Sequence, residues 1–264
     1  MTLSRWLLFK IAVRSFLLQA SWNYRGMMSM GFLYSIAPGL DCIYDDKKAR
    51  ELAYMRHFEY FNTNPYFSSI VMGVTLALEE KYKSGDKLVN PEVIHNTKDA
   101  LMTSLAGIGD GLFWDSWRPF VATLAIVFAA GNYKLTPFIF LVLYNIPHLY
   151  FRFAGIYWGY DEGMNVSKKL RQFMFPQIRQ TLRMGTLALL AYLIPNHVNL
   201  HTPFLLANLR LELFYFGEKV VQGLGALVLV ALGTIAYRQE VNVLLISFLL
   251  LIFALVFYHW GILI

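Results

Sequence analysis

The apolar run at residues 241–264 limits the possible folds of this chain more than any other feature. It contains no aspartate, glutamate, lysine or arginine. A helix of about 20 apolar residues crosses the hydrocarbon core of a bilayer. Hydrophobic residues make up 57% of the chain and charged residues only 15%, below the roughly one quarter that is usual for soluble domains. We therefore expect a polytopic membrane protein, rather than a soluble globule, a disordered chain or a disulfide-stapled domain.

Further apolar segments favour an all-α fold with several spans. They are residues 119–131, 135–151, 182–195 and 220–237, which with 241–264 predict about five transmembrane helices. No segment has the alternation of a strand, and no separate soluble domain is visible. We expect one membrane domain over 1–264, divided into amphipathic or interface helices at 1–64, re-entrant core segments at 65–118 and transmembrane spans at 119–264.

The first 64 residues mix apolar and charged side chains without a stretch long enough to span. Arg5, Lys10 and Arg14 interrupt the N-terminal apolar residues, so we expect no cleavable signal peptide. The pair Pro38-Gly39 predicts a break in the chain. The sequence DDKKARELAYMRHFEYFN then predicts a helix whose N-terminus carries acidic residues.

The basic residues indicate the membrane orientation. The net charge is +6, and residues 119–183 hold seven basic and two acidic side chains. A basic cluster directly before an apolar segment is typical of the cytoplasmic end of a helix, and it does not favour nucleic-acid binding, which uses a basic soluble face. The loop 196–219 has only two basic residues. We therefore expect 156–183 to be cytoplasmic, 196–219 to be outside and Ile264 to lie outside.

Two short apolar runs, 66–78 and 100–114, are the strongest sequence signal for a transport site. The first lies between Asn64-Pro65 and Glu79-Glu80, and the second contains three glycines and Asp110. Runs of this length are too short to span and favour re-entrant or interfacial segments. Broken helices expose backbone N–H and C=O groups that have to line a polar cavity, because lipid cannot form hydrogen bonds with them.

Polar residues beside these runs are our candidates for the substrate path, because an ionisable group at membrane depth indicates function. Amide, hydroxyl and carboxylate groups also suit a sugar, whose hydroxyls both donate and accept hydrogen bonds. The candidates are Glu59, Asn62, Thr63, Asp110 and Arg118, followed by Glu79 and Glu80. The alternative is that the acids pair with Arg118 or Arg56 at subunit contacts, or are hydrated at the interface.

Other motifs do not predict an enzyme. The GIGDG sequence lacks the preceding strand that a nucleotide site requires, and His197 and His201 lack the acid of a zinc motif. His57 has no neighbours that would organise it to carry a phosphoryl group, and Cys42 has no adjacent base to activate it. We expect no metal, no cofactor and no catalytic residue, because no nucleophile–base pair is present.

Five sequence blocks resemble one known family. They are RSFLLQASWNYRGMMSMGF, RHFEYFNTNPY, GVTLALEEK, LAGIGDGLFWDSWRP and RFAGIYWGY, in the family's order and spacing. The chain resembles the IID component of the bacterial phosphoenolpyruvate-dependent sugar phosphotransferase system, mannose/fructose/sorbose class. The resemblance implies location in the bacterial cytoplasmic (inner) membrane and an obligate IIC membrane partner, with which IID assembles into a higher oligomer. It also implies that soluble IIA and IIB components pass on the phosphoryl group and that IID has no phosphorylated residue.

The resemblance implies a transport role. IIC and IID translocate a hexose or amino sugar, and IIB phosphorylates it on arrival at the cytoplasmic side. The charged ester then cannot readily recross the bilayer. One alternative is a scaffold, with every sugar contact in IIC and a docking face for IIB on IID. A second is a self-sufficient proton-coupled sugar transporter that uses Asp110 or Glu79.

Overall fold

The computed structural model is all-α over the residues that it describes. These are 3–197, 231–232, 234–235, 238–239 and 242–259. Within them the only β pairing is two isolated bridges, Asn23 to Met27 and Met27 to Phe61, so the predicted all-α class is confirmed. The chain divides into two compact units, Met1–Thr186 and Leu187–Ile264. Residues 198–219 of the predicted outer loop and most of the predicted span 220–237 lie outside the described residues, while residues 196 and 197 belong to the last turn of a helix.

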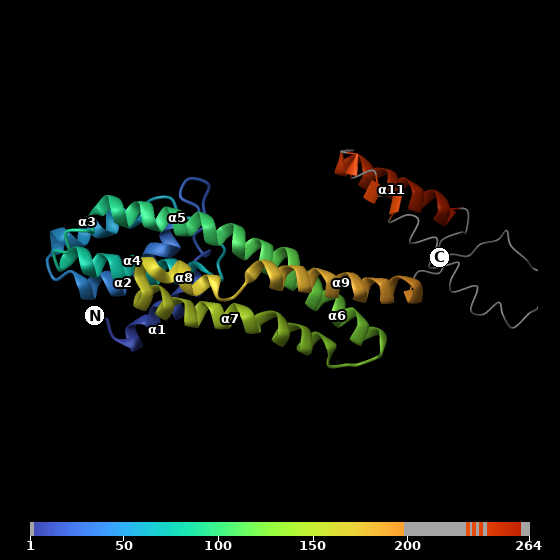
Figure 1. The fold of residues 1–264 in the computed structure, drawn as a ribbon, viewed down its shortest axis with the longest axis horizontal. Coiled ribbons are helices and arrows are strands. Elements are labelled where there is room, and N and C mark those ends of the chain that lie inside the picture. The colour runs from blue at the N-terminus through green and yellow to red at the C-terminus, as the bar shows by residue number, and fades with distance from the viewer. Residues whose placement is uncertain (1–2, 198–230, 233, 236–237, 240–241, 260–264) are drawn as a thin grey trace, which may run out of the picture. The chain divides into compact units, whose positions relative to one another are not determined.

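Helices follow one another with short connections in the first unit (Figure 1). They are α1 (Arg5–Arg14), α2 (Ser29–Ile43), α3 (Lys47–His57), α4 (Ser68–Lys83), α5 (Pro91–Gly109), the π-helical segment η2 (Asp110–Trp117), α6 (Arg118–Ala130), α7 (Thr136–Glu162) and α8 (Val166–Arg171), with short 3₁₀ turns at Ser15–Leu17 and Gly163–Asn165. Helix α9 (Phe175–His197) continues into the second unit, which also contains α11 (Val243–His259).

Helix α4 forms the centre of the first unit. Every residue from Ser68 to Glu79 is buried, as expected for a helix that is apolar on all sides. The glycines of α4 and α7 bring the two backbones together. A Cβ atom at Gly73 would lie 2.3 Å from the Ile156 carbonyl oxygen, and one at Gly159 would lie 2.2 Å from the Ile70 carbonyl oxygen. The short run 66–78 is therefore enclosed by protein, and its re-entry into a bilayer stays a prediction.

Capping side chains fix the start of two helices. The Asp46 carboxylate accepts a 2.8 Å hydrogen bond from the Ala49 amide at the start of α3, as the acidic N-terminus of this segment predicts. Asn90 caps α5 in the same way by accepting from the Val93 amide at 2.8 Å, and Pro91 occupies the first turn.

The break predicted at Pro38-Gly39 is wrong. Pro38 lies inside α2, although an interior proline removes a hydrogen bond and costs about 3 kcal/mol. The side chains of Phe32, Ile36 and Leu40 are fully buried on one face of α2. Burial of such side chains stabilises by about 1.5–3 kcal/mol each, so tertiary packing outweighs the local penalty.

Helices α5, η2 and α6 follow one another without a connecting loop from Pro91 to Ala130. The glycine-rich sequence at 107–111 therefore does not end the helix but leads into a wider π-helical turn. The hydroxyl of Ser116 donates a 2.8 Å hydrogen bond to the Gly111 carbonyl, five residues earlier, which matches the wider turn.

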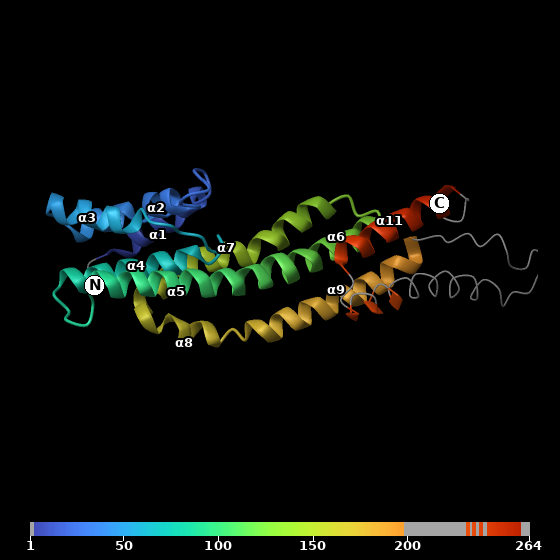
Figure 2. The same ribbon diagram turned by 90° about the horizontal axis from the view of Figure 1, so that it is seen from above.

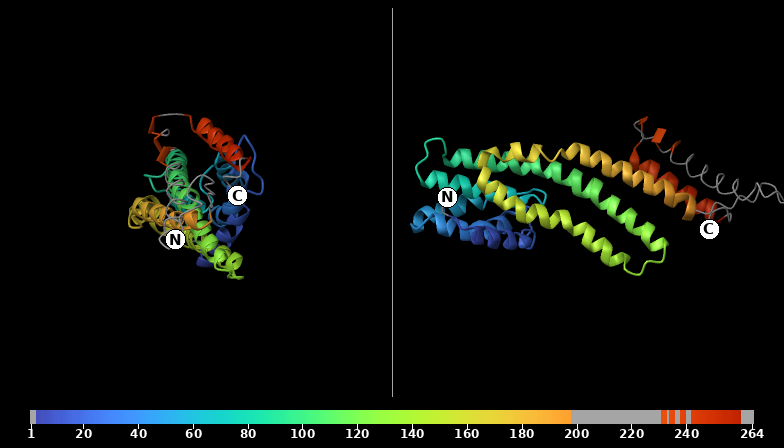
Figure 3. Two further views of the ribbon diagram at one scale, coloured as in Figure 1. Left: turned by 90° about the vertical axis from the view of Figure 1, so that its right-hand side faces the viewer. Right: turned by 60° about the horizontal axis from the view of Figure 1, so that its bottom comes forward.

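Helices α6 and α7 form the hairpin predicted around residues 131–134. Its turn lies at the end of the first unit away from α1 to α3 (Figure 2 and Figure 3). Large apolar side chains on the hairpin are at least half exposed, namely those of Ile126, Leu135, Phe138, Leu141 and Ile146. Among the described residues, one helical stretch, Thr136–Arg171, is long and apolar enough to cross a membrane. The number of spans stays a prediction.

Candidate functional site

The predicted substrate-path residues lie at several separate places in the first unit. The most buried is Glu79, at the end of α4, with no exposed surface. Its carboxylate accepts two hydrogen bonds from Arg56, from Nε and Nη2, each at 2.9 Å. The His57 Nε2 atom lies 2.7 Å from Glu79 Oε1, and the Tyr44 hydroxyl donates to Oε2 at 2.7 Å. The pairing with Arg56 that the sequence left open is present, and it lies inside the chain's own core.

Burial and hydrogen bonding oppose each other at this buried centre. Burial raises the pKa of Glu79, but the hydrogen bonds from His57 and Arg56 outweigh it and lower the pKa to about 2. Burial lowers the pKa of His57 more than Glu79 raises it, so the imidazole is neutral near pH 7 and donates its Nε2 hydrogen to Glu79. The His57 Nδ1 atom is buried and has no hydrogen-bond partner in the described structure. Glu79 is therefore a fixed anion that holds α2, α3 and α4 together.

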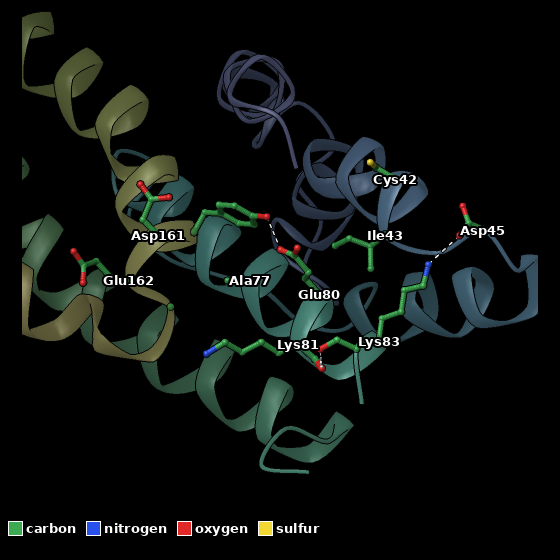
Figure 4. Close-up of a pocket in the computed structure, with 12 residues that line it drawn as sticks. Cys42, Ile43, Asp45, Ala77, Glu80, Lys81, Lys83, Asp161 and Glu162 are labelled. Carbon is green, nitrogen blue, oxygen red and sulfur yellow. Dashed lines mark hydrogen bonds and ion pairs between the residues drawn. The ribbon is translucent and has the colours of Figure 1, made fainter. Parts of the chain in front are cut away.

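Glu80, the neighbouring acid, faces a cavity of about 740 Å³ between α2, α4 and the end of α7 (Figure 4). The Tyr160 hydroxyl donates a hydrogen bond to Glu80, and Lys83 pairs with Asp45 at 3.0 Å. Asp161, also on the wall, pairs with Arg5 at 2.8 Å. The cavity is polar, but much of its charge is already neutralised within the chain.

The loop before α4 meets the π-helical segment. The Asn64 side-chain amide donates a 2.9 Å hydrogen bond to Asp110, and the Thr63 hydroxyl donates to the Met102 carbonyl at 2.9 Å. The loop packs tightly here, because a Cβ atom at Gly109 would lie 2.4 Å from the Asn64 Cβ atom. Thr63 and Asn64 are buried, whereas Asp110 is exposed and Asn62 is half-buried. The structure thus packs the 62–64 loop along the helix from Met102 to Asp110, with Asn62 and Thr63 at Met102 and Asn64 at Asp110.

Glu59 and Arg118 do not join this region through ion pairs. Glu59 is half exposed and contacts two side chains of α5, His95 at 2.8 Å and Lys98 at 3.8 Å. The Arg118 guanidinium lies 5.9 Å from the centre of the Trp114 ring. In the part of the chain that the structure describes, Arg118 forms no ion pair with a carboxylate, so the pairing with Arg118 that the sequence left open is not observed there.

Arg152 is a buried cation that the sequence did not single out. It is 4% exposed, on α7, and donates to the backbone carbonyls of Ser15 and Pro65 and to the Ser15 hydroxyl. Its Nε atom donates to His148 at 3.0 Å. Main-chain carbonyls have no signature in a sequence, so no signal identifies these partners.

No metal site is present among the described residues, where no group of three His, Cys, Asp or Glu side chains comes together. His201, half of the histidine pair noted in the sequence, lies outside the described range.

Comparisons with known proteins identify relatives along the whole chain. The model of the PTS system mannose/fructose/sorbose family IID component matches residues 2–263. The mannose-specific EIID component of Escherichia coli K12 is 37% identical over 161 residues, which are 61% of this chain and 56% of that protein. The fructose permease IID component of Bacillus subtilis is 29% identical over 90% of each chain. The sorbose-specific EIID component of Lacticaseibacillus casei is 27% identical over 97% of this chain and 93% of its own.

Two solved structures are also similar. One, described as a membrane protein, has a TM-score of 0.79 at 29% identity and is covered over 99% of its length by this entire chain. The other is the mannose transporter ManYZ in complex with microcin E492, with a TM-score of 0.59 at 29% identity over 99% of this chain and 98% of that one.

Proposed function

Because the chain belongs to the mannose/fructose/sorbose family of phosphotransferase IID components, we propose that it translocates a hexose or amino sugar together with an IIC membrane subunit. The IIB component then phosphorylates the sugar at the cytoplasmic side, and IIA supplies the phosphoryl group. IIC and IID assemble into a higher oligomer. The exposed apolar surface of the α6–α7 hairpin supports both membrane insertion and contact with such a partner.

The convergence of the 62–64 loop with the π-helical segment is the observation on which the sugar-path proposal rests. The Asn62 side-chain amide has no hydrogen-bond partner in the described structure, and its backbone amide donates to Met102 Sδ at 3.1 Å. Further along the same helical stretch, the exposed Asp110 carboxylate accepts a hydrogen bond from Asn64, two residues after Asn62. An amide and a carboxylate are suitable partners for sugar hydroxyls. π-helical turns occur frequently at functional sites. Asn62 and Asp110 are therefore our sugar-contacting residues, and Thr63 positions the loop.

The remaining candidates have structural roles in this proposal. Glu79 is fully buried and accepts bonds from three side chains, and Glu80 accepts from Tyr160. Glu59 connects to α5 through His95. Arg118 is the exception: it is exposed at the start of α6 beside Trp114, and in this proposal it gates the path. The low pKa of Glu79 argues against a proton-coupled transporter that uses Glu79 as its carrier, since a proton carrier has to bind and release protons near pH 7.

The chain itself carries no phosphoryl group in this proposal. The His57 ring is completely buried and its Nε2 atom is occupied by Glu79, so a donor protein cannot reach it. Cys42 is exposed, but no base among the described residues hydrogen-bonds to it.

The scaffold alternative has support of its own. Five of the seven predicted residues form hydrogen bonds or ion pairs with other groups of the same chain, namely Glu59, Thr63, Glu79, Glu80 and Asp110. If Asn62 and Asp110 are equally structural, every sugar contact lies in IIC and this chain supplies the frame and a docking face for IIB.

Measurement of sugar binding by the purified complex with IIC distinguishes the sugar-path proposal from the scaffold alternative. Calorimetry compares wild type with Asn62→Ala and Asp110→Asn over a panel of hexoses and amino sugars. Loss of a buried sugar hydrogen bond costs about 1–3 kcal/mol, which is roughly a five- to 150-fold loss of affinity. Asn96→Ala and Glu92→Gln, at exposed positions of α5, are matched controls. Unchanged affinity in an intact complex would establish the scaffold role.

A further inference from the structure

A second cavity, of about 560 Å³, lies between α5 and the connection from α8 to α9. Its walls are mainly apolar, with Leu101, Leu105 and Ile108 from α5 facing Leu170 and Phe175. The predicted substrate-path residues do not line it, so the cavity is distinct from the proposed sugar path. An apolar cavity of this size accommodates part of a lipid acyl chain.

Two arginines line this cavity, and no acidic residue does. Arg171 and Arg179 form no ion pair within the described ranges, and the Arg179 Nε atom is buried there without a hydrogen-bond partner. The Arg179 guanidinium packs against the π-helical segment at Gly111, where a Cβ atom would lie 2.4 Å from its Cζ atom. The side chain is thus held at the cavity by packing, and its charge is not neutralised by a carboxylate.

The position of the cavity along α5 matches the boundary of a membrane. Leu101 to Ile108 come directly before η2 and the apolar helix α6, whose hairpin with α7 exposes large apolar side chains. The arginines belong to the acid-free basic segment 168–183, which the positive-inside rule assigns to the cytoplasmic face. Basic pockets at this level bind the headgroups of anionic lipids.

We propose that this cavity binds an anionic phospholipid of the inner leaflet, with an acyl chain against Leu101, Leu105 and Ile108 and the phosphate at Arg171 and Arg179. The proposal rests on the membrane location of the chain and is independent of which residues contact sugar. It predicts that the bound lipid joins the π-helical segment to α8 and α9.

Native mass spectrometry of the purified complex with IIC tests the proposal. The complex is titrated with phosphatidylglycerol or with phosphatidylcholine of the same acyl chains, and the retained lipid is counted. We expect at least a tenfold preference for phosphatidylglycerol, reduced about fivefold by either Arg171→Gln or Arg179→Gln. The matched control Lys168→Gln removes the same charge from the same segment outside the cavity and should keep the preference.

A second pair of variants tests the acyl-chain contact without a change of charge. Ser104→Phe fills the cavity, and Thr103→Phe places the same ring at an exposed neighbouring position that does not line it. Only Ser104→Phe should reduce phosphatidylglycerol retention. Equal retention of the two lipids, an equal effect of Lys168→Gln, or complete competition by glycerol 3-phosphate would overturn the proposal. Protection of Ser104→Cys from a thiol reagent by IIC would do so as well, since the partner would then occupy the cavity.

Discussion

His57 and Glu79 form a 2.7 Å hydrogen bond in which neither side chain has any exposed surface. The bond joins the end of α3 to the end of α4, and Arg56 and Tyr44 complete the shell around the carboxylate. The charges balance only while the carboxylate is ionised, because His57 is neutral and Arg56 is always protonated.

Removal of the charge at Glu79 should strongly destabilise the fold. Glu79→Gln leaves the half-buried Arg56 guanidinium without its anion, and loss of one partner of a buried ion pair costs about 3–5 kcal/mol. Thermal unfolding followed by circular dichroism measures the effect. The control Asp45→Asn breaks an exposed pair with Lys83 and should change the melting temperature little. A Glu79→Gln melting temperature equal to that of the control would contradict a structural role for this centre.

Acid should destabilise the protein in two stages. Because the folded pKa of His57 lies below its ordinary 6.5, the unfolded chain binds a proton there first, and stability falls as the pH drops below about 6.5. Glu79 has a folded pKa of about 2 against 4.5, so its contribution is complete above 4.5 and is lost as the pH falls toward 2. Denaturant unfolding between pH 8 and 4 measures the first stage. His57→Gln should flatten the decrease between pH 6.5 and 5, and an unchanged slope would refute the assignment.

Glycine-to-alanine substitutions should destabilise the fold where the glycine lies in a helix–helix contact and not where it faces open space. Gly73→Ala places a methyl group against the Ile156 backbone and should cost about 1–3 kcal/mol through overpacking. Gly107→Ala adds the same methyl group in open space and should stabilise α5 by up to about 1 kcal/mol, since alanine favours helix. The difference in unfolding free energy between the two variants is the test. Equal effects would mean that α4 and α7 do not touch through their backbones.

The single cysteine of the chain provides a test of orientation. Cys42 lines the polar cavity whose wall also includes Glu162, a residue of the segment 156–183 that the positive-inside rule assigns to the cytoplasm. A membrane-impermeant maleimide should therefore label Cys42 in inside-out vesicles and not in intact cells. The variant Cys42→Ser, which has no cysteine, is the negative control for labelling. Labelling in intact cells would reverse the proposed orientation and place Ile264 inside.

Local signals predicted local structure well. Asp46 and the acidic start of α3 act within one helical turn, and the hairpin at 131–134 follows from two apolar segments with too few residues between them for anything but a turn. The five sequence blocks indicated the family, and the family model confirms that membership over residues 2–263.

Long-range partners could not be predicted in the same way. Arg152 binds carbonyls 137 and 87 residues away in sequence, and Glu79 finds Arg56 across a separation of 23 residues. Such pairings depend on how α1, α3, α4 and α7 pack against one another. The hydrophobic periodicity of a single helix carries no information about that packing. Tertiary packing also explains the wrong prediction at Pro38. A proline normally interrupts a helix, but burial of the neighbouring apolar side chains keeps α2 continuous through it.

The backbone contact between α4 and α7 has a mechanical consequence. Helix α7 begins in the exposed apolar hairpin and ends against Gly73 of α4, where no side chain lies between the two backbones to absorb displacement. A displacement of α7 between Pro147 and this contact is therefore transmitted directly to the helices that surround Glu79, whereas Pro147, inside α7, interrupts the backbone hydrogen bonds between the contact and the apolar end. Any hinge used during transport has to lie outside this contact, and Pro147 within α7 is one position where the helix can bend.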